Sequence, residues 1–235
     1  MLTTVLFDLD GTLLPMELDR FLEHYFALLT KKLAAHDYDP KAVINGMWEG
    51  VNAMIANDGS STNEDAFWKA FCKEIGKDVR KDMPLFEDFY RNEFIGAKDA
   101  CGFDKKAVQT VAAVKARGLR TVLATNPLYP AIATESRIRW AGFRPEDFEL
   151  YTTYEDTRHC KPNPAYYRDI LDQLGLKAEE CLMVGNDATE DTAAAKVGMK
   201  VFLLPKYLVN RHHVDISAYP QGDFDDLLKY IDSLR

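Results

Sequence analysis

Two aspartates spaced two residues apart follow the first apolar run of the chain. Residues 5–7 (Val-Leu-Phe) have the composition of a short buried strand, and Asp8 comes directly after them, followed by Asp10 and Gly11. Open α/β sheets bind ligands at the carboxyl ends of their strands, so we expect Asp8 at the mouth of a crevice. Two carboxylates this close repel each other unless a cation, a proton or a lysine joins them. This spacing favours a metal or phosphoryl-transfer site over an ordinary Asp-Gly turn.

Three more groups of polar side chains stand beside predicted elements later in the chain. They are Thr125 with Asn126 after an apolar run at 119–124, Lys161 just before a helix start, and Asp187 with Asp191 after a buried run at 181–184. Singly, each group has an ordinary interpretation as a turn, an exposed lysine or a helix cap. A parallel sheet would bring the strand ends to one edge, however, and the joint order along the chain indicates one shared site.

Phosphoryl transfer is the chemistry that these residue types fit. An ionised carboxylate can attack phosphorus and form an aspartyl-phosphate, and Asp8 at the rigid strand end is the candidate nucleophile. Asp10 is placed to give a proton to the leaving oxygen and later to take one from water.

Positive charge must offset the charge that spreads over the phosphoryl oxygens. We expect two cations to do so: a Mg²⁺ ion held by Asp8, the Asp10 carbonyl and Asp187, and Lys161, which is also a candidate to bind the substrate phosphate. The Thr125 hydroxyl and the Asn126 backbone N–H are the candidate phosphate-binding groups.

The elements that position these residues fall into two kinds. Helical spacing dominates residues 16–33, 40–56, 63–75 and 84–94, and no strand signal occurs between residues 15 and 94. From residue 104 onward helices and strands alternate, with a weak strand at 148–152 and a helix of small residues at 189–197. We therefore predict an α/β fold: a doubly wound, parallel-sheet, Rossmann-like core (1–14 and 97–235) with an inserted all-helical cap domain (15–96).

The sequence resembles the haloacid dehalogenase superfamily of phosphohydrolases over nearly its whole length. The matching motifs are Asp8-Leu9-Asp10-Gly11-Thr12-Leu13, Thr125-Asn126, Lys161-Pro162-Asn163-Pro164 and Val184-Gly185-Asn186-Asp187 through Asp191. The resemblance implies a nucleophile at Asp8, an acid/base at Asp10, phosphate contacts at Thr125 and Asn126, and a lysine at 161 that orients the nucleophile. It also implies a helical cap that closes over the site and screens substrates.

The fourth motif departs from the family pattern at one position. The family usually has Asp directly after the glycine, where this chain has Asn186. Asp187 follows and keeps a four-residue spacing to Asp191. We assign the metal to Asp187, with Asn186 as an alternative or extra ligand and Asp191 as a residue that supports the ligands from behind.

The composition limits which classes of partner and which cell compartment we expect for this protein. The chain has 235 residues and a net charge of −8, without a basic block, so a nucleic-acid role is not expected. No apolar run approaches the length of a membrane span. The four scattered cysteines and the uncharged first residues predict a cytoplasmic protein with free thiols. The sequence does not distinguish a monomer from a homodimer.

The sequence thus predicts a Mg²⁺-dependent phosphatase acting on a small phosphorylated metabolite. A phosphomutase of the β-phosphoglucomutase kind would keep the same residues and differ in the cap, and a non-catalytic phosphate-sensing protein on this fold is the alternative from another class.

In the cap, Trp48 and Trp68 are expected in the core. Glu17, Asp19 and Arg20 lie just past the first motif, where a solvated helix face is expected.

Overall fold

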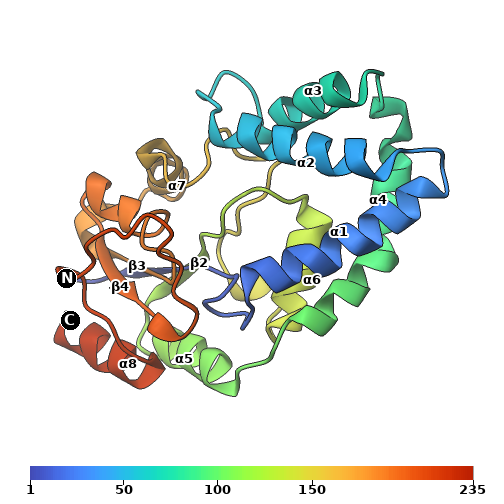
Figure 1. Ribbon diagram of the computed structural model, residues 1–235. Helices are drawn as coiled ribbons and strands as arrows, with labels where there is room; N and C mark the ends of the chain where they lie inside the picture. Colours follow the sequence, from blue (N-terminus) through green and yellow to red (C-terminus); the bar gives the residue numbers. More distant parts are fainter. Residues whose placement is uncertain (235) are drawn as a thin grey trace.

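A parallel four-stranded sheet forms the centre of the protein in the computed structural model. The model describes residues 1–234, and Arg235, the last residue of the predicted core, lies outside the described residues. The strands are β1 (Thr4–Phe7), β2 (Arg120–Leu123), β3 (Cys181–Gly185) and β4 (Lys200–Leu203), in the order β2-β1-β3-β4 (Figure 1). β1 pairs with β2 and β3 on either side, so the residues that follow it lie in the middle of one sheet edge.

Both faces of the sheet are covered, as a doubly wound fold requires. Val5 and Phe7 belong to one apolar cluster and Leu6 to another, because successive side chains of a strand point to opposite faces. Helices α5 (Lys105–Ala116) and α8 (Phe224–Ser233) pack on the first face, and α7 (Pro164–Leu174) with the short 3₁₀ helix η5 (Thr192–Val197) covers the second. The predicted α/β class is confirmed.

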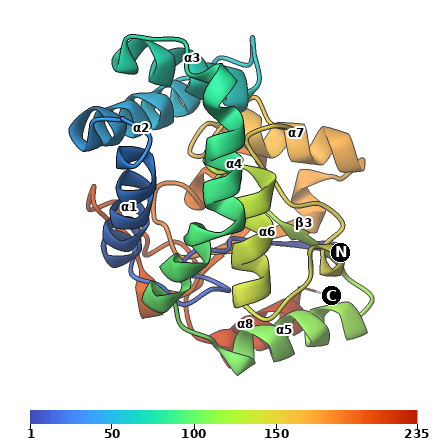
Figure 2. The same cartoon turned by 90° about the vertical axis from the view of Figure 1, so that its right-hand side faces the viewer.

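A helical block is inserted between β1 and α5. It contains α1 (Leu18–Ala34), α2 (Pro40–Ile55), α3 (Asn63–Ile75), α4 (Met83–Arg91) and the 3₁₀ segment η2 (Glu93–Ala100). Figures 1 and 2 show these helices gathered to one side of the sheet, with α4 running beside α6 (Ala131–Trp140). The domain boundaries at 14/15 and 96/97 stay a prediction. The remaining 3₁₀ turns are η1 (Arg80–Asp82), η3 (Pro145–Asp147), η4 (Ala178–Glu180) and η6 (Pro205–Tyr207).

Local sequence signals account for the ends of the inserted helices. Pro40 occupies the first turn of α2, and the Asp39 carboxylate accepts from the Ala42 N–H at 2.8 Å. Thr62 caps α3 in the same way, and Gly76 ends that helix with a left-handed φ of 75°. Within residues 1–234, no helix combines the length and apolarity that crossing a bilayer requires.

Two predicted elements are wrong. Residues 148–152 form no strand: Tyr151 makes an isolated bridge to Leu123, while Phe148 turns inward to the core. The helix predicted at 189–197 is replaced by a turn and then η5. In the turn, Oδ1 of Asp187 accepts from the N–H groups of Thr189 and Glu190. The Asp191 side chain is tied to Lys161 and to the Asn186 N–H, and after it the Ala194 N–H bonds to the Asp191 carbonyl three residues back, the pattern of a 3₁₀ helix.

Candidate active site

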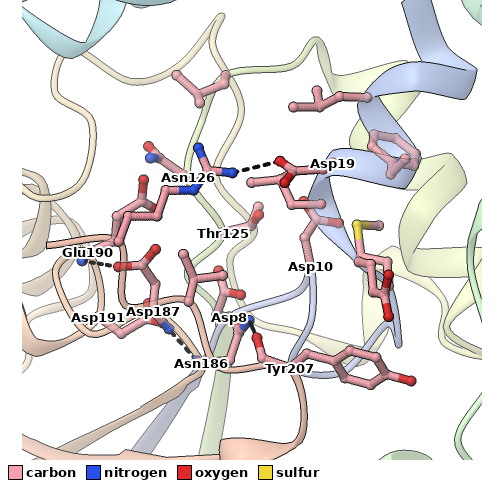
Figure 3. Close-up of a pocket in the computed structure, with 18 of the residues that line it drawn as sticks. Asp8, Asp10, Asp19, Thr125, Asn126, Asn186, Asp187, Glu190, Asp191 and Tyr207 are labelled. Atoms are coloured by element: carbon pink, nitrogen blue, oxygen red, sulfur yellow. Dashed lines mark hydrogen bonds and ion pairs between the residues drawn. The ribbon is translucent and has the colours of Figure 1, made fainter. Parts of the chain in front are cut away.

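A cavity of about 800 Å³ lies where the carboxyl ends of β1, β2 and β3 face helices α1 and α2. Its floor consists of the side chains predicted from the sequence, namely Asp8, Asp10, Thr125, Asn126, Asn186, Asp187 and Asp191 (Figure 3). Lys161 lies beneath them, completely buried. The structure therefore brings all the candidate residues to one edge of the sheet, as the order of motifs predicts.

Lys161 joins two of the carboxylates below this floor. Its Nζ is 2.9 Å from Oδ1 of Asp8 and 2.7 Å from Oδ1 of Asp191. Burial would lower the pKa of Lys161, but the charges of Asp191 and Asp8 outweigh it and hold that pKa well above its usual value. Burial is also the largest influence on Asp8 and raises its pKa to about 7, against the opposing attraction of Lys161. The buried lysine thus fixes one oxygen of Asp8.

The loop after β2 is tied to Lys161. The Asn126 side chain accepts from the Lys161 backbone N–H at 3.2 Å through Oδ1, and its Nδ2 donates to the Lys161 carbonyl at 3.4 Å. The Thr125 carbonyl accepts from Thr152 and from the hydroxyl of Tyr166 on α7. These bonds hold the second and third motifs in a fixed relation to each other.

The loop after β3 is organised around Asp191. Oδ2 of Asp191 accepts from the backbone N–H groups of Asn186 (2.9 Å) and Asp187 (2.8 Å). This approach requires a glycine at 185, because a Cβ there would lie 2.0 Å from Asp191 Oδ2. Asp191 consequently connects Lys161 on one side with the backbone of the fourth motif on the other.

Asn186 links the fourth motif to the first. Its Oδ1 accepts from the Thr12 hydroxyl at 2.9 Å, and its Nδ2 donates to the Tyr207 carbonyl at 2.7 Å. Gly11 has a left-handed φ of 82°, and a Cβ on it would lie 2.3 Å from Asn186 Nδ2. Both ends of the amide are therefore already engaged with the protein.

The donor set of the floor fits a hard divalent cation. Burial raises the pKa of Asp187, and it raises that of Glu190, which also lines the cavity, to about 8. Desolvated carboxylates of this kind are stabilised by a bound cation. Within residues 1–234 no three His, Cys, Asp or Glu side chains cluster closely enough to hold a metal by themselves. The predicted set needs two carboxylates, because its third oxygen is the Asp10 backbone carbonyl.

Arg137 is a site residue that the sequence reasoning missed. It lies on α6, is fully buried, and makes an ion pair with Oδ2 of Asp10. Its guanidinium carbon also lies 4.2 Å from the centroid of the Tyr129 ring, and Nη2 donates to Thr134 at 3.2 Å. Its spacing was the available signal: Arg137 follows Ala133 by four residues and so shares the inward face of α6. An arginine on a buried face needs a partner of opposite charge.

The cap residues meet expectation in part. Trp68 is buried in the core, but Trp48 is 43% exposed and lines the cavity, so its predicted core position is wrong. Glu17 and Asp19 line the cavity as well, whereas Arg20 is exposed outside it. The helical period of α2 places Trp48 on the face that looks toward the sheet edge, which periodicity alone does not distinguish from a core face.

Known proteins resemble this chain in sequence and in fold. The model of the haloacid dehalogenase-like hydrolases matches residues 2–198. The phosphoglycolate phosphatase of Rhodospirillum rubrum is 30% identical over 209 residues, which cover 85% of this chain and 78% of that protein. That of Colwellia psychrerythraea is 28% identical over 235 residues, covering 98% and 96%. A 2-haloacid dehalogenase from Pseudomonas syringae pv. Tomato, 18% identical, superposes over both full chains with a TM-score of 0.68, a likeness of fold alone.

Proposed function

The chain belongs to the haloacid dehalogenase-like hydrolase family, and we propose that it is a Mg²⁺-dependent phosphatase that hydrolyses a small phosphorylated metabolite through a phosphorylated Asp8. The observation that carries the proposal is the placement of Asp8 at the end of β1. One of its oxygens is bound by Lys161 at 2.9 Å, and Asp10 lines the same cavity two residues along the chain. We place the protein in the cytoplasm, in keeping with four free cysteines among residues 1–234.

Asp8 is the nucleophile in this proposal. Lys161 holds Oδ1, so Oδ2 attacks phosphorus; the new Asp8 O–P bond forms as the bond from phosphorus to the leaving oxygen breaks. Asp10 gives its proton to that leaving oxygen. In the second step Asp10 takes a proton from water, whose oxygen bonds to phosphorus while the Asp8 O–P bond breaks, releasing inorganic phosphate and restoring both carboxyl groups.

The other polar groups hold charge in place. Thr125 and Asn126 bind the phosphoryl oxygens, and Lys161 offsets the negative charge of the carboxylates. Mg²⁺ would be held by Asp8, the Asp10 carbonyl and Asp187, and when bound it would neutralise part of the charge on the phosphoryl group.

Isotope transfer tests the reaction class directly. The wild-type protein is incubated with para-nitrophenyl phosphate and Mg²⁺ in ¹⁸O-labelled water, and both the released phosphate and the peptide that contains Asp8 are weighed. We expect label in the phosphate and an unlabelled Asp8. Label in the Asp8 carboxylate, the outcome for attack of water on a carbon ester of Asp8, would overturn the proposal.

Two variants separate the roles of the paired carboxylates. Asp8→Asn should abolish turnover while the fold survives, because the amide keeps the shape of the side chain and loses its nucleophilic charge. Asp10→Asn should accumulate phosphorylated Asp8, since water then lacks its base while para-nitrophenolate leaves without an acid. Turnover by Asp8→Asn at the wild-type rate would reject Asp8 as nucleophile.

A further inference from the structure

The roof of the active-site cavity is apolar, in contrast to its charged floor. On α2 the lining residues Met47, Trp48, Val51 and Ile55 follow helical spacing, and on α1 the lining residues Leu18, Leu22 and Phe26 do the same. These are two adjoining helix faces turned toward the catalytic carboxylates. Between them these two faces contribute seven apolar side chains to the lining of one cavity.

Part of this surface is open to solvent. Trp48 is 43% exposed, Ile55 41% and Leu18 37%. Phe26 and Trp48 approach with ring centroids 5.6 Å apart, tilted by 57°, so that one edge of the roof is aromatic. Large apolar side chains gathered on one exposed surface indicate a site at which something apolar is bound.

The roof offers an anionic group nothing to pair with. Among the lining residues that α1, α2 and the segment before α1 contribute within the described chain, none is lysine, arginine or histidine, while Glu17 and Asp19 are acidic. Two basic side chains come from the loop after β4, and both have acidic partners: Arg211 with Asp19 at 2.7 Å and Lys206 with Asp104 at 3.4 Å. A second carboxylate or phosphate placed against the α1 and α2 faces would therefore meet apolar and acidic groups, and the two basic side chains beyond them already pair with carboxylates.

We propose that the substrate is the phosphate ester of a neutral, largely apolar alcohol, whose alkyl or aryl group lies against the α1 and α2 faces while its phosphate lies at Asp8. This inference rests on the proposed phosphatase function and adds the leaving group to it. The roof and the carboxylates line one cavity, so the alcohol part of an ester whose phosphate lies at Asp8 can reach the roof. A volume of about 800 Å³ also far exceeds what a two-carbon acid needs.

A homologous series of n-alkyl phosphates provides the test. From ethyl to hexyl phosphate the leaving oxygen keeps nearly the same basicity, so a change in kcat/KM reports contact with the chain rather than chemistry. Each of the four added methylenes should raise kcat/KM about threefold to fourfold, which amounts to roughly 80- to 250-fold over the series. Phosphoglycolate and pyrophosphate should be hydrolysed less efficiently than hexyl phosphate. A flat series, or phosphoglycolate as the better substrate, would overturn the inference.

A matched pair of isoleucines assigns the effect to the roof. Ile55 lines the cavity and Ile95 does not, and both are exposed, at 41% and 66%. Ile55→Ala should lower kcat/KM for hexyl phosphate about tenfold, with a smaller loss for ethyl phosphate, because part of the contact with the chain disappears. Ile95→Ala should leave both values unchanged. Equal losses in the two variants would place the alkyl chain elsewhere.

Measuring binding in the absence of turnover tests the apolar subsite separately from the proposed phosphatase activity. Hexylphosphonate and methylphosphonate, which carry no hydrolysable ester, are titrated into the Mg²⁺-loaded protein by calorimetry. Tighter binding of hexylphosphonate with no turnover of any ester would overturn the phosphatase proposal and leave the apolar subsite. Turnover of small esters together with equal binding of the two phosphonates would leave the phosphatase and overturn the subsite.

Discussion

The guanidinium of Arg137 pairs with the carboxylate of Asp10, the proposed general acid and base. Arg137 is fully buried on α6, and the side chain of Asp10 is 24% exposed at the cavity floor. Tyr129 lies under the guanidinium, and Thr134 accepts from its second nitrogen. Because Tyr129 and Thr134 hold the guanidinium in place, its ion pair fixes the position of one Asp10 oxygen relative to the substrate in the proposed reaction.

Replacing Arg137 should therefore impair proton transfer more than binding. Arg137→Lys keeps the charge but loses the planar contacts to Tyr129 and Thr134, and we expect a fall in kcat of about 10- to 100-fold with little change in KM. The loss should be smaller for para-nitrophenyl phosphate, whose leaving group needs no acid, than for an alkyl phosphate. Steady-state kinetics with the two esters measures this. Equal losses for both would make Arg137 a purely structural residue.

Position in the secondary structure explains why the floor of this site could be predicted from the sequence and Arg137 could not. Asp8, Asp10, Lys161 and the fourth motif follow strands or precede helices, so the parallel sheet fixes their common edge in advance. Arg137 reaches Asp10 across 127 positions of the chain from the interior of a helix, a contact that depends on how α6 is packed. The spacing within α6 places Arg137 on the buried face with Ala133, but it does not show which residue of another element the arginine meets.

In the cap, the sequence predicts where the helices lie but not which of their apolar faces is buried. Its helices were predicted to within a few residues, because periodicity and capping signals are local. The predicted core position of Trp48 is nevertheless wrong, because a stripe of apolar residues has the same helical spacing whether it faces other side chains or a cavity. The helix predicted at 189–197 is a turn followed by η5, and Asp191 between them is tied to Lys161 and to the Asn186 N–H, contacts that local sequence patterns do not reveal.

Lys161 should contribute to stability as well as to activity. Lys161→Met leaves Asp8 and Asp191 buried without their shared cation, a change that destabilises proteins by about 3–5 kcal/mol. Urea unfolding followed by circular dichroism measures the loss. Lys206→Met, at an exposed lysine on the same cavity, is the control and should unfold near the wild-type midpoint. Similar midpoints for the two variants would mean that the buried triad adds no net stability.

The metal-free protein should lose stability as the pH rises. Burial raises the folded-state pKa of Asp8 from 3.8 to about 7 and that of Glu190 from 4.5 to about 8. Between its unfolded and folded pKa values, each carboxyl group binds more protons in the folded protein than in the unfolded chain. Protonation of these two groups therefore stabilises the folded state: the contribution is fully present below about pH 4 and is lost as the pH rises through the folded pKa values of about 7 and 8. Melting temperatures in EDTA from pH 5 to pH 8.5 should fall, and fall less in Asp8→Asn. A wild-type melting temperature that climbs over this range would contradict the assignment.

Asp187 is the expected direct metal ligand in the fourth motif. The carboxylate of Asp187 adds charge to oxygen coordination, and hard dications favour such ligands. Oδ1 of Asp187 accepts from the N–H groups of Thr189 and Glu190, which orients the carboxylate, whereas both ends of the Asn186 amide are engaged with other groups.

We expect Asp187→Ala to raise the Mg²⁺ concentration for half-maximal activity by roughly 100-fold, and Asn186→Ala to raise it by less than about tenfold. Asn186→Ala should instead lower the melting temperature, because it removes the bonds to Thr12 and Tyr207. Asp187→Asn is the matched control, since it keeps the oxygen that caps the turn and loses the charge. The Mg²⁺-induced rise in melting temperature gives a second readout that needs no turnover. If Asn186→Ala abolishes that rise and Asp187→Ala retains it, then Asn186 is the direct ligand and the motif is registered one residue earlier.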